Sequence, residues 1–396
     1  MGNNKSIKKL ANTYCYGCSL CSCICPKHII NLKLNRNGFY QPVIIDEKAC
    51  IQCGLCLKVC SYYNEAPKVS VDALQGFATW SKEDAVRRKA SSGGTGFEIA
   101  RSLLNRGYKV LAVRYNTEKQ EAEHYVANSE TELIAGMGSK YIQSNTEDAF
   151  LSMKKGEKYL VTGTPCQIAS MWRYIRQKRM EENVVLMDFF CHGVPSKLVW
   201  DKYIVELEPR IGKIVYASWR NKQTGWHDSW SMGLDGDKAG TPVNWHDSYN
   251  MLIREKKTSY TSRRSEGDLF YKFFLSDVCF NKACYKDCKF KYLQSAADIR
   301  IGDLWGSKYA DDEKGVTGVL TFTDKGKCIL SDCNIEKIPE SVEVVTEGQL
   351  KGNLSRPYFY YFLLALLRTP LPLRYIYRFV QMLRIGSILK YKLHLK

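Results

Sequence analysis

Residues 15–26 read CYGCSLCSCICP, and residues 50–61 read CIQCGLCLKVCS. Both stretches follow the pattern Cys-x2-Cys-x2-Cys-x3-Cys, and each cysteine of the second run comes 35 residues after its counterpart in the first. In this pattern three thiolates of a run bind one iron–sulfur cube, and the fourth binds the cube of the other run. The repeat therefore decides the fold of this part of the chain, because the two loops must lie side by side to exchange ligands.

Ligand exchange divides the eight cysteines into two sets. One [4Fe–4S] cluster is expected on Cys15, Cys18, Cys21 and Cys60. The second is expected on Cys50, Cys53, Cys56 and Cys25. Cys23 falls outside the spacing and is interpreted as a bystander thiol. Residues 8–64 resemble a bacterial two-cluster ferredoxin domain, with one departure: Ser61 stands where a proline usually follows the last ligand.

Two other uses of cysteine fit these runs less well. Disulfides form in oxidising compartments, and no secretory signal is recognised before residue 15. Zinc sites usually take two separated Cys-x2-Cys pairs, whereas these cysteines come in runs of four. With 16 cysteines in 396 residues, the chain is expected to work in a reducing cytoplasm and to bind metal through its thiols.

The composition is that of a globular protein of two or three domains, with 45% hydrophobic and 25% charged residues. The formal charge is +17, part of which thiolate-bound clusters would offset. A net positive charge favours binding to anionic partners, of which nucleic acid is one. However, the sequence carries no nucleic-acid-binding motif. We therefore expect no nucleic acid among the partners.

Beyond the cysteine runs, the pattern alternates between strands and helices. The residues between the two runs predict a hairpin that brings the cysteine loops together. Three strand–turn–helix units follow, with turns near residues 91, 162 and 191, and a buried strand is predicted within residues 297–306. Such units place their turns at the carboxyl edge of an α/β sheet, where open sheets bind ligands.

Two of these turns lie at predicted helix starts that suit an anion. Residues 91–94 read SSGG, and the N–H groups of a helix start attract phosphate, although a flexible helix start explains them equally well. Residues 162–166 read TGTPC, with Pro165 at the first helical position. Cys166 at this helix start is either a reactive or ligating thiol or a small buried residue. Lys140 lies in GSKYIQS (138–144), for which a surface turn is the plain reading.

A third group of thiols follows at Cys279-x4-Cys284-x3-Cys288. Three cysteines in ten residues indicate metal binding, but a fourth ligand is missing locally. Cys191, at the end of a predicted strand, is the first candidate, and Cys166 is the second. We therefore predict a third [4Fe–4S] cluster on Cys191, Cys279, Cys284 and Cys288, with zinc as the alternative.

Two further stretches are unusual in composition. SWRNKQTGW (218–226) interleaves aromatic and basic residues, and a half-buried sheet face is favoured over stacking on a ring-shaped cofactor. From Lys351 to Lys396 there are nine Lys or Arg and no Asp or Glu, and the apolar run within this tail is too short to span a bilayer. Basic amphipathic helices on an anionic membrane surface and a helical cap on the preceding domain are both open readings.

Several motifs together carry a resemblance to a known family. In order they are SSGGTG, GSKYIQS, TGTPCQIASM, DFFCHGVPS, SWRNKQTGW, CYKDCKFK and ADIRIGDLWG. Up to about residue 345, the chain resembles the coenzyme F420 hydrogenase/dehydrogenase beta-subunit family, in its bacterial form with a fused N-terminal ferredoxin. The resemblance implies FAD in the α/β domain and [4Fe–4S] clusters that exchange electrons with it. For the bacterial relatives it implies an occurrence with polysaccharide-biosynthesis genes.

The resemblance also assigns residues. It implies flavin contacts from Ser91, Ser92, Gly93, Gly94, Lys140, Thr162, Gly163, Thr164, Pro165 and Cys166. It implies that the cluster closest to the flavin is bound by Cys191, Cys279, Cys284 and Cys288. His192 and Asp303 end predicted strands near this site and are the candidates for catalytic proton transfer, with structural roles as the alternative.

The expected architecture is mixed, α+β and α/β. It comprises a two-[4Fe–4S] ferredoxin-like domain over 8–64, a flavin-binding domain over 74–345 and a basic helical tail over 346–396. The expected function is that of a cytoplasmic iron–sulfur flavoprotein oxidoreductase, which passes electrons between a ferredoxin-like donor or partner redox subunit and an unidentified organic acceptor. A non-catalytic electron-transfer subunit and a membrane-associated scaffold with structural clusters are the alternatives. Each of these three functions is compatible with a homo-oligomer. Each is also compatible with peripheral contact between the tail and the inner membrane surface.

Overall fold

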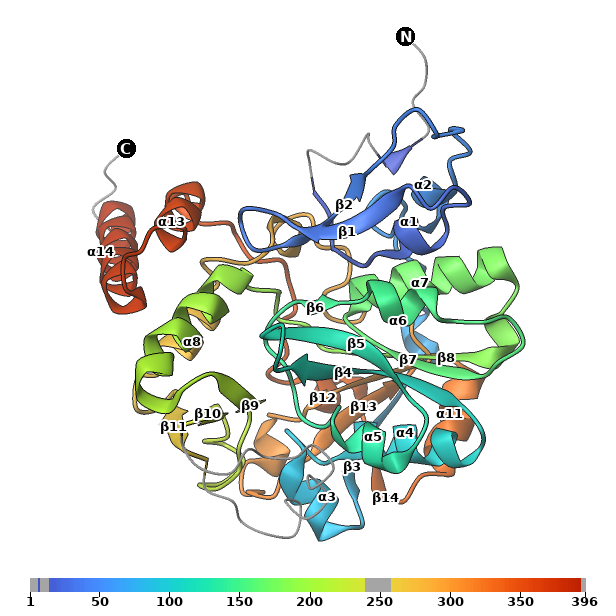
Figure 1. Ribbon diagram of the computed structural model, residues 1–396. Helices are drawn as coiled ribbons and strands as arrows, with labels where there is room; N and C mark the ends of the chain where they lie inside the picture. The colour runs from blue at the N-terminus through green and yellow to red at the C-terminus, as the bar shows by residue number, and fades with distance from the viewer. Residues whose placement is uncertain (1–5, 8–13, 239–257, 393–396) are drawn as a thin grey trace.

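The computed structural model describes residues 6–7, 14–238 and 258–392. Figure 1 shows a small segment that holds the two cysteine runs, a larger α/β body below it, and two C-terminal helices at the edge of the molecule. The predicted start of the ferredoxin-like domain, at residue 8, lies outside the described residues. The mixed α/β class is confirmed.

The described helices are α1 (Leu20–Cys23), α2 (Leu55–Val59), α3 (Asp84–Lys89), α4 (Thr95–Asn105), α5 (Glu130–Ile134), α6 (Glu147–Leu151), α7 (Pro165–Lys178), α8 (Lys197–Ile211), α10 (Leu269–Phe274), α11 (Asp324–Ser331), α12 (Val342–Thr346), α13 (Tyr360–Leu367) and α14 (Leu373–Lys392). The described strands are β1 (Ile30–Leu34), β2 (Tyr40–Ile44), β3 (Gln75–Ser81), β4 (Lys109–Asn116), β5 (Glu121–Ala127), β6 (Ser144–Asn145), β7 (Tyr159–Thr162), β8 (Val184–Phe189), β9 (Ile214–Ser218), β10 (Ser231–Gly236), β11 (Tyr260–Arg263), β12 (Ile299–Asp303), β13 (Thr317–Thr321) and β14 (Ile335–Glu340).

The large sheet has the strand order β14-β3-β13-β12-β8-β7-β4-β5-β6. Its centre, β12-β8-β7-β4, is parallel. The strands β13, β3 and β14 pair antiparallel with their neighbours, and β5 pairs antiparallel with β4 but parallel with β6. The predicted strand–turn–helix units are present: β7 leads into α7, whose first residue is Pro165, and β8 leads into α8 after the N-cap residue Ser196. Because the central strands run in one direction, their carboxyl ends meet at one edge of the sheet.

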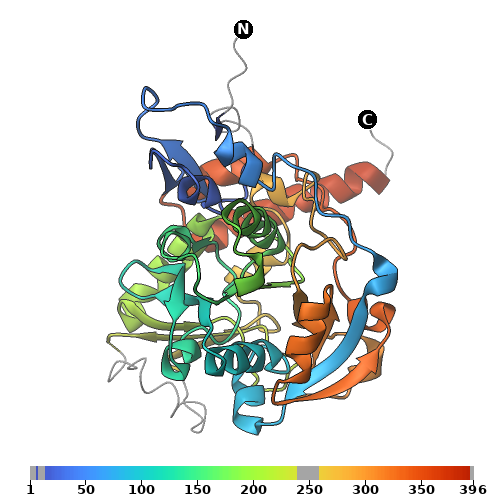
Figure 2. The same ribbon diagram turned by 90° about the vertical axis from the view of Figure 1, so that its right-hand side faces the viewer.

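Helices cover both faces of this sheet. One face packs against α4, α5 and α11 through an apolar core that includes Ile99 and Ile329. The other face packs against α6 and α7, and residues of the cysteine segment, Leu20 and Val59, join Met171 in this second core. Figure 2, turned by 90°, shows the cysteine segment above the body on this side of the molecule. The segment is therefore anchored to the body through a shared core.

The two cysteine loops repeat in backbone conformation as they do in sequence. Gly17 and Gln52 have φ values of 71° and 54°, and Ser19 and Gly54 have φ values of 56° and 74°. Within each pair the residues are 35 positions apart, as are the first residues of α1 and α2. The antiparallel hairpin β1–β2 lies between the loops, as predicted.

A second, three-stranded antiparallel sheet has the order β11-β10-β9. Together with α8, α10, α13 and α14 it encloses an aromatic core that includes Trp200, Phe270 and Tyr360. The strands β9 and β10 are antiparallel neighbours, and SWRNKQTGW forms most of the loop between them. The tail is helical, as predicted, and none of the described helices has the length and apolar character needed to cross a bilayer.

Candidate functional site

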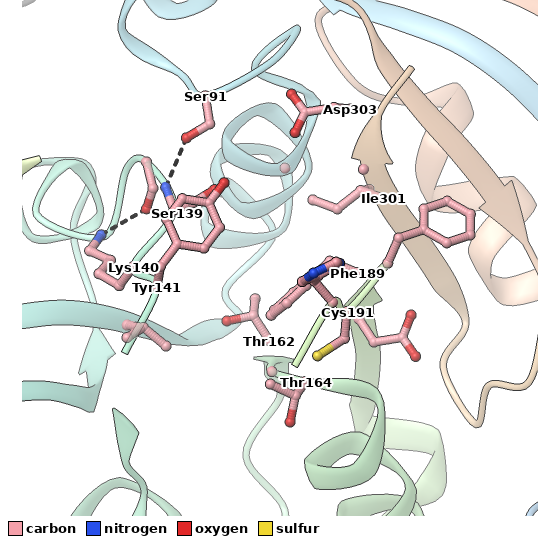
Figure 3. Close-up of a pocket in the computed structure, with 18 of the residues that line it drawn as sticks. Ser91, Ser139, Lys140, Tyr141, Thr162, Thr164, Phe189, Cys191, Ile301 and Asp303 are labelled. Atoms are coloured by element: carbon pink, nitrogen blue, oxygen red, sulfur yellow. Dashed lines mark hydrogen bonds between the residues drawn. The ribbon is translucent and has the colours of Figure 1, made fainter. Parts of the chain in front are cut away.

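A cavity of about 480 Å³ opens at the carboxyl ends of the central parallel strands. Thr162 ends β7, Phe189 ends β8 and Asp303 ends β12, and all three line the cavity. The start of α4 and the loop 136–144 complete its walls. Figure 3 shows the side chains from these separate elements arranged around one space. This is the edge at which an open α/β sheet is expected to bind its ligand.

The Ser91–Gly94 loop is fixed at the cavity wall by its glycines. The Gly93 N–H group donates to Thr317 Oγ1 at 2.9 Å, and a Cβ atom on Gly93 would lie only 2.4 Å from the Thr79 carbonyl oxygen. Gly94 has a φ of +89°, which other residues rarely adopt, and it caps the 11-residue helix α4. The residues of this loop that line the cavity are Ser91, Ser92 and Gly94. The predicted anion-compatible helix start therefore faces the cavity.

Residues 138–144 form another wall of the cavity, whereas their plain reading was a surface turn. The Ser139 N–H group donates to Ser91 Oγ at 2.8 Å, so this loop is tied to the start of α4 (Figure 3). The Lys140 ammonium donates to the carbonyls of Gly136, Met137 and Gly138 at 2.8, 2.9 and 3.0 Å. Burial lowers the pKa of Lys140 to about 7. Lys140 lines the cavity, but its ammonium is committed to its own loop.

Residues of the turn 162–166 contribute both to the cavity and to a cluster of thiols beside it. Thr162, Gly163 and Thr164 line the cavity. Thr164 caps α7 in a reciprocal arrangement with Gln167, which fixes the start of this helix. Neither Pro165 nor Cys166 is among the residues that line the cavity. Cys166 instead belongs to a cluster of thiols beside it.

Four thiols from different elements share one site. They are Cys166 at the start of α7, Cys191 after β8, and Cys284 and Cys288 in the segment after α10. Burial raises the pKa of the first three, for Cys284 to about 12, and the charges of neighbouring thiols in this group raise it further. The charge of one thiol raises the pKa of another only when the two sulfurs lie near each other. We refer to these residues as the third thiol set; Cys191 lines the cavity as well (Figure 3).

Cys279 is not brought together with the other three cysteines of the predicted set. Its side chain is completely buried in the aromatic core, among residues such as Phe274, Phe280 and Tyr360. Burial raises the pKa of Cys279 to about 12, and the charge that adds to this rise is that of Asp277. Cys191, Cys284 and Cys288 of the predicted set thus act on one another electrostatically, and Cys166, the second candidate from the sequence, acts together with them.

The structure places the N-terminal thiols close to one another, and their division into the two sets expected from the spacing stays a prediction. Burial raises the pKa of Cys15, Cys18, Cys21 and Cys60, and within this first thiol set the sulfurs act on one another. The second thiol set, Cys25, Cys50, Cys53 and Cys56, lines a small apolar pocket of its own. Cys23 packs in the core shared with α7. Within the described residues, no three Cys, His, Asp or Glu side chains are arranged to hold a single metal ion.

Hydrogen bonds connect each of the two thiol sets, the first and the third, to residues that lie beside the other set in the sequence. The Ser61 hydroxyl donates to the carbonyl oxygen of Cys166 at 2.9 Å, and the Ser61 N–H group donates to Ser170 Oγ at 3.0 Å. The Asn281 amide donates to the carbonyl oxygen of Cys15 at 3.0 Å. Tyr16, next to a first-set ligand, is buried near Cys166, Cys284 and Cys288. The two thiol sets are therefore neighbours.

Comparison with known families matches most of the chain. Two models of the coenzyme F420 hydrogenase/dehydrogenase beta subunit match: the model of its N-terminal part over residues 77–150, and the model of its C-terminal part over residues 156–346. The chain belongs to the coenzyme F420 hydrogenase/dehydrogenase beta-subunit family. The cavity and the third thiol set lie almost wholly within the matched ranges, whereas the two N-terminal cysteine runs precede them.

Comparison with curated proteins gives no match. Among solved structures, a chain of the F420-reducing [NiFe] hydrogenase complex from Methanosarcina barkeri is similar at 15% sequence identity. The alignment covers 75% of this chain and 98% of that chain, with a TM-score of 0.43. Membership of the hydrogenase/dehydrogenase beta-subunit family makes this chain a redox protein.

Asp303, one of the two residues predicted to transfer protons, is held in a buried ion pair. The Arg220 guanidinium donates to both of its carboxylate oxygens at 2.9 and 3.1 Å, and Trp226 Nε1 donates to one of them at 3.0 Å. Arg220 lies between the rings of Trp230 and Trp305, 5.0 and 5.3 Å from their centroids. The sequence reasoning did not foresee this partner, although Arg220 stands in the aromatic and basic stretch that it singled out.

His192, the other candidate, lines the cavity beside Cys191. Its Nε2 atom lies 2.6 Å from Asp277 Oδ1, and its ring contacts those of Phe274 and Phe280, each at 5.6 Å between centroids. A carboxylate hydrogen-bonded to one ring nitrogen fixes the orientation of an imidazole. His192 is therefore the better placed of the two residues to hold a proton at the cavity.

Proposed function

We propose that this chain is an iron–sulfur flavoprotein oxidoreductase that moves electrons between a ferredoxin-type donor or partner redox subunit and an organic acceptor. One observation carries the proposal: Cys191 belongs both to the third thiol set and to the wall of the cavity. An electron carrier on these thiols would lie directly against a ligand in the cavity.

The three thiol sets fit iron–sulfur clusters. Twelve thiols in three groups are more than a globular core needs, and burial makes their uncompensated thiolates unfavourable. Iron supplies the compensating positive charge, so such thiols bind a cluster more readily than they ionise alone. For the third cluster we propose the ligands Cys166, Cys191, Cys284 and Cys288.

The cavity fits a flavin nucleotide. Its volume of about 480 Å³ lies within the range of cofactor pockets, roughly 300–1,000 Å³. Phe97, Met187 and Ile301 supply apolar walls for a flat ring system, and the N-terminus of α4 offers N–H groups and a favourable dipole to a diphosphate. Iron–sulfur clusters would carry electrons singly, and FAD would exchange them in pairs with an organic substrate.

The contacts of the thiol sets support an order among them. In the second set Cys53 is exposed, which suits an outer position accessible to a donor. The first set contacts the third through Ser61, and the third borders the cavity at Cys191. The sequence of sites from the surface to the cavity is therefore second set, first set, third set.

Within the cavity we assign different roles to the polar residues. Lys140 shapes the loop 136–144, and Asp303 holds Arg220 in the wall, so neither presents a free charge to the ligand. His192, oriented by Asp277, is the residue we propose for proton transfer. For the acceptor, the resemblance to bacterial relatives points to polysaccharide biosynthesis.

The test is anaerobic purification followed by iron, sulfide, zinc and flavin analysis. About twelve iron atoms, about twelve sulfides and one FAD per chain are expected. Replacement of Cys328, an exposed thiol outside all three sets, is the matched control and leaves these values unchanged. Iron without flavin would indicate a non-catalytic electron-transfer subunit, and zinc in place of iron would refute the electron-transfer role. Full function in cysteine variants that have lost their clusters would indicate a scaffold.

A further inference from the structure

The two C-terminal helices carry an exposed apolar surface. Seven of the large apolar side chains exposed in the described residues lie between Tyr358 and Met382. Tyr358 and Met382 themselves are 71% and 69% exposed. Single exposed apolar residues are ordinary, but a contiguous group marks a site of interaction. We call this surface the tail patch; it consists of Tyr358, Tyr361, Phe362, Leu371, Tyr375, Phe379 and Met382.

The tail patch is separate from the face by which α14 packs on the protein. Leu373, Ile376 and Val380 are buried in the aromatic core. Tyr375 and Phe379, one helical turn apart, instead point outward with Met382. Figure 1 shows α13 and α14 at the edge of the molecule beside α8. The helix therefore has its core contact already and presents a second apolar stripe to the outside.

Two contacts connect the part of the tail patch around α13 to the part on α14. The rings of Phe362 on α13 and Phe379 on α14 lie 6.1 Å apart. The Tyr358 hydroxyl donates to the carbonyl oxygen of Leu383 at 3.4 Å. The patch is thus a surface built by both helices.

The charges around the tail patch are positive. Exposed arginines accompany it along both helices, namely Arg356, Arg368, Arg374, Arg378 and Arg384. From Lys351 to Lys396 the sequence has no acidic residue. Glu206 on the neighbouring α8 accepts a hydrogen bond from the Leu373 N–H group, so this carboxylate is engaged at the start of α14. Aromatic rings and arginines therefore alternate without the mixture of signs that most protein surfaces show.

We propose that the tail patch lies on an anionic lipid bilayer, with the aromatic side chains at the headgroup level and the arginines against lipid phosphates. Aromatic rings favour the membrane–water interface, and basic residues add attraction to anionic headgroups. The tail patch carries only positive charges, which favours an anionic lipid surface. A protein partner would need a surface with only negative charges to fit it equally well. This proposal does not depend on the identity of the cofactors.

The experiment is sedimentation of the full-length, cluster-loaded protein with vesicles. Phosphatidylcholine vesicles are compared with vesicles containing about one-third phosphatidylglycerol, at low and at high salt. Binding is expected to the anionic vesicles and to weaken with salt. The double variants Phe379→Ser/Met382→Ser and Arg374→Gln/Arg378→Gln are each expected to lower the apparent affinity at least about tenfold.

Matched control variants separate the tail patch from general surface effects. Leu151→Ser removes an exposed apolar side chain on α6, and Lys154→Gln/Lys155→Gln removes two exposed charges next to it. These controls are expected to bind vesicles like the unaltered chain. Iron content and circular dichroism verify that every variant is folded.

Three results would overturn the proposal. The first is no binding of the unaltered chain to anionic vesicles at low salt. The second is equal loss of binding in the tail and control variants. The third is a change from oligomer to monomer in the tail variants without loss of vesicle binding, which would make the patch an interface between copies of the chain.

Discussion

Replacing Cys166 with serine is expected to remove one of the three proposed iron–sulfur clusters and leave the other two. The Cys166 thiol is affected by the charges of Cys191, Cys284 and Cys288, and serine keeps its size while removing the thiolate ligand. The same replacement at Cys279 is the matched comparison. Cys279 was the fourth ligand predicted from the sequence, but it lies in the aromatic core.

The structure sets the size of each effect. Cys166→Ser lowers the iron content from about twelve to about eight atoms per chain, since one four-iron cluster is lost. Cys279→Ser leaves about twelve atoms but places a hydroxyl at a completely buried apolar position, which costs about 1–3 kcal/mol of stability. The Cys166→Ser variant should thus lose iron, whereas the Cys279→Ser variant should keep its iron and lose stability.

The assay combines iron and sulfide analysis of anaerobically purified protein with denaturant unfolding. Cys328→Ser, at an exposed position, is the control for both measurements. A Cys279→Ser variant with eight irons and a Cys166→Ser variant with twelve would refute the ligand set proposed here. That result would restore the set predicted from the sequence.

Three further outcomes are expected from single replacements. Arg220→Leu leaves the Asp303 carboxylate without its buried partner and should cost about 3–5 kcal/mol in denaturant unfolding, whereas a loss below 1 kcal/mol would show that the pair is unimportant. Burial lowers the pKa of His124 from 6.5 to about 4. As the pH drops below 6.5, this histidine is protonated in the unfolded chain but not in the folded one, so the free energy of unfolding falls by about 1.4 kcal/mol per pH unit. His124→Gln should show a shallower dependence between pH 7 and 5.5, and equal slopes would contradict this. Ser61→Ala removes the hydrogen bond to the Cys166 carbonyl and should cost about 1 kcal/mol, and an unchanged unfolding midpoint would argue against the contact.

The parts of the structure that local sequence could predict are those fixed by covalent spacing. The two cysteine runs impose the same left-handed conformations at Gly17 and Gln52 and again at Ser19 and Gly54, because each loop must wrap around its own site. Pro165 at the start of α7 was likewise predictable, since proline fits the first turn of a helix and few other positions in it.

The parts that it could not predict depend on contacts between distant segments. Spacing alone favours Cys279 as a ligand because it lies close to Cys284 in sequence, but the Cys279 side chain is completely buried, and the charge that raises its pKa is that of Asp277 and not that of another thiol. Lys140 appeared free to meet a ligand, yet three carbonyls of its own loop take its protons. The Arg220–Asp303 pair joins residues 83 positions apart, which no local pattern reveals.

The hydrogen bonds of Ser61 explain why a serine suits the position that is usually a proline in ferredoxins. A ferredoxin usually has proline after its last ligand, and proline has no N–H group to donate. In this chain the Ser61 N–H group bonds Ser170 and its hydroxyl bonds the Cys166 carbonyl, both on α7. A free-standing ferredoxin has no such helix to bind, so the serine in this chain has partners that such a protein would lack. Cys60 is covalently next to Ser61, and Cys166 lies at the other end of the hydrogen bond. This bond therefore links the segment of the first thiol set directly to that of the third, across the separation that the proposed electron transfer would have to cover.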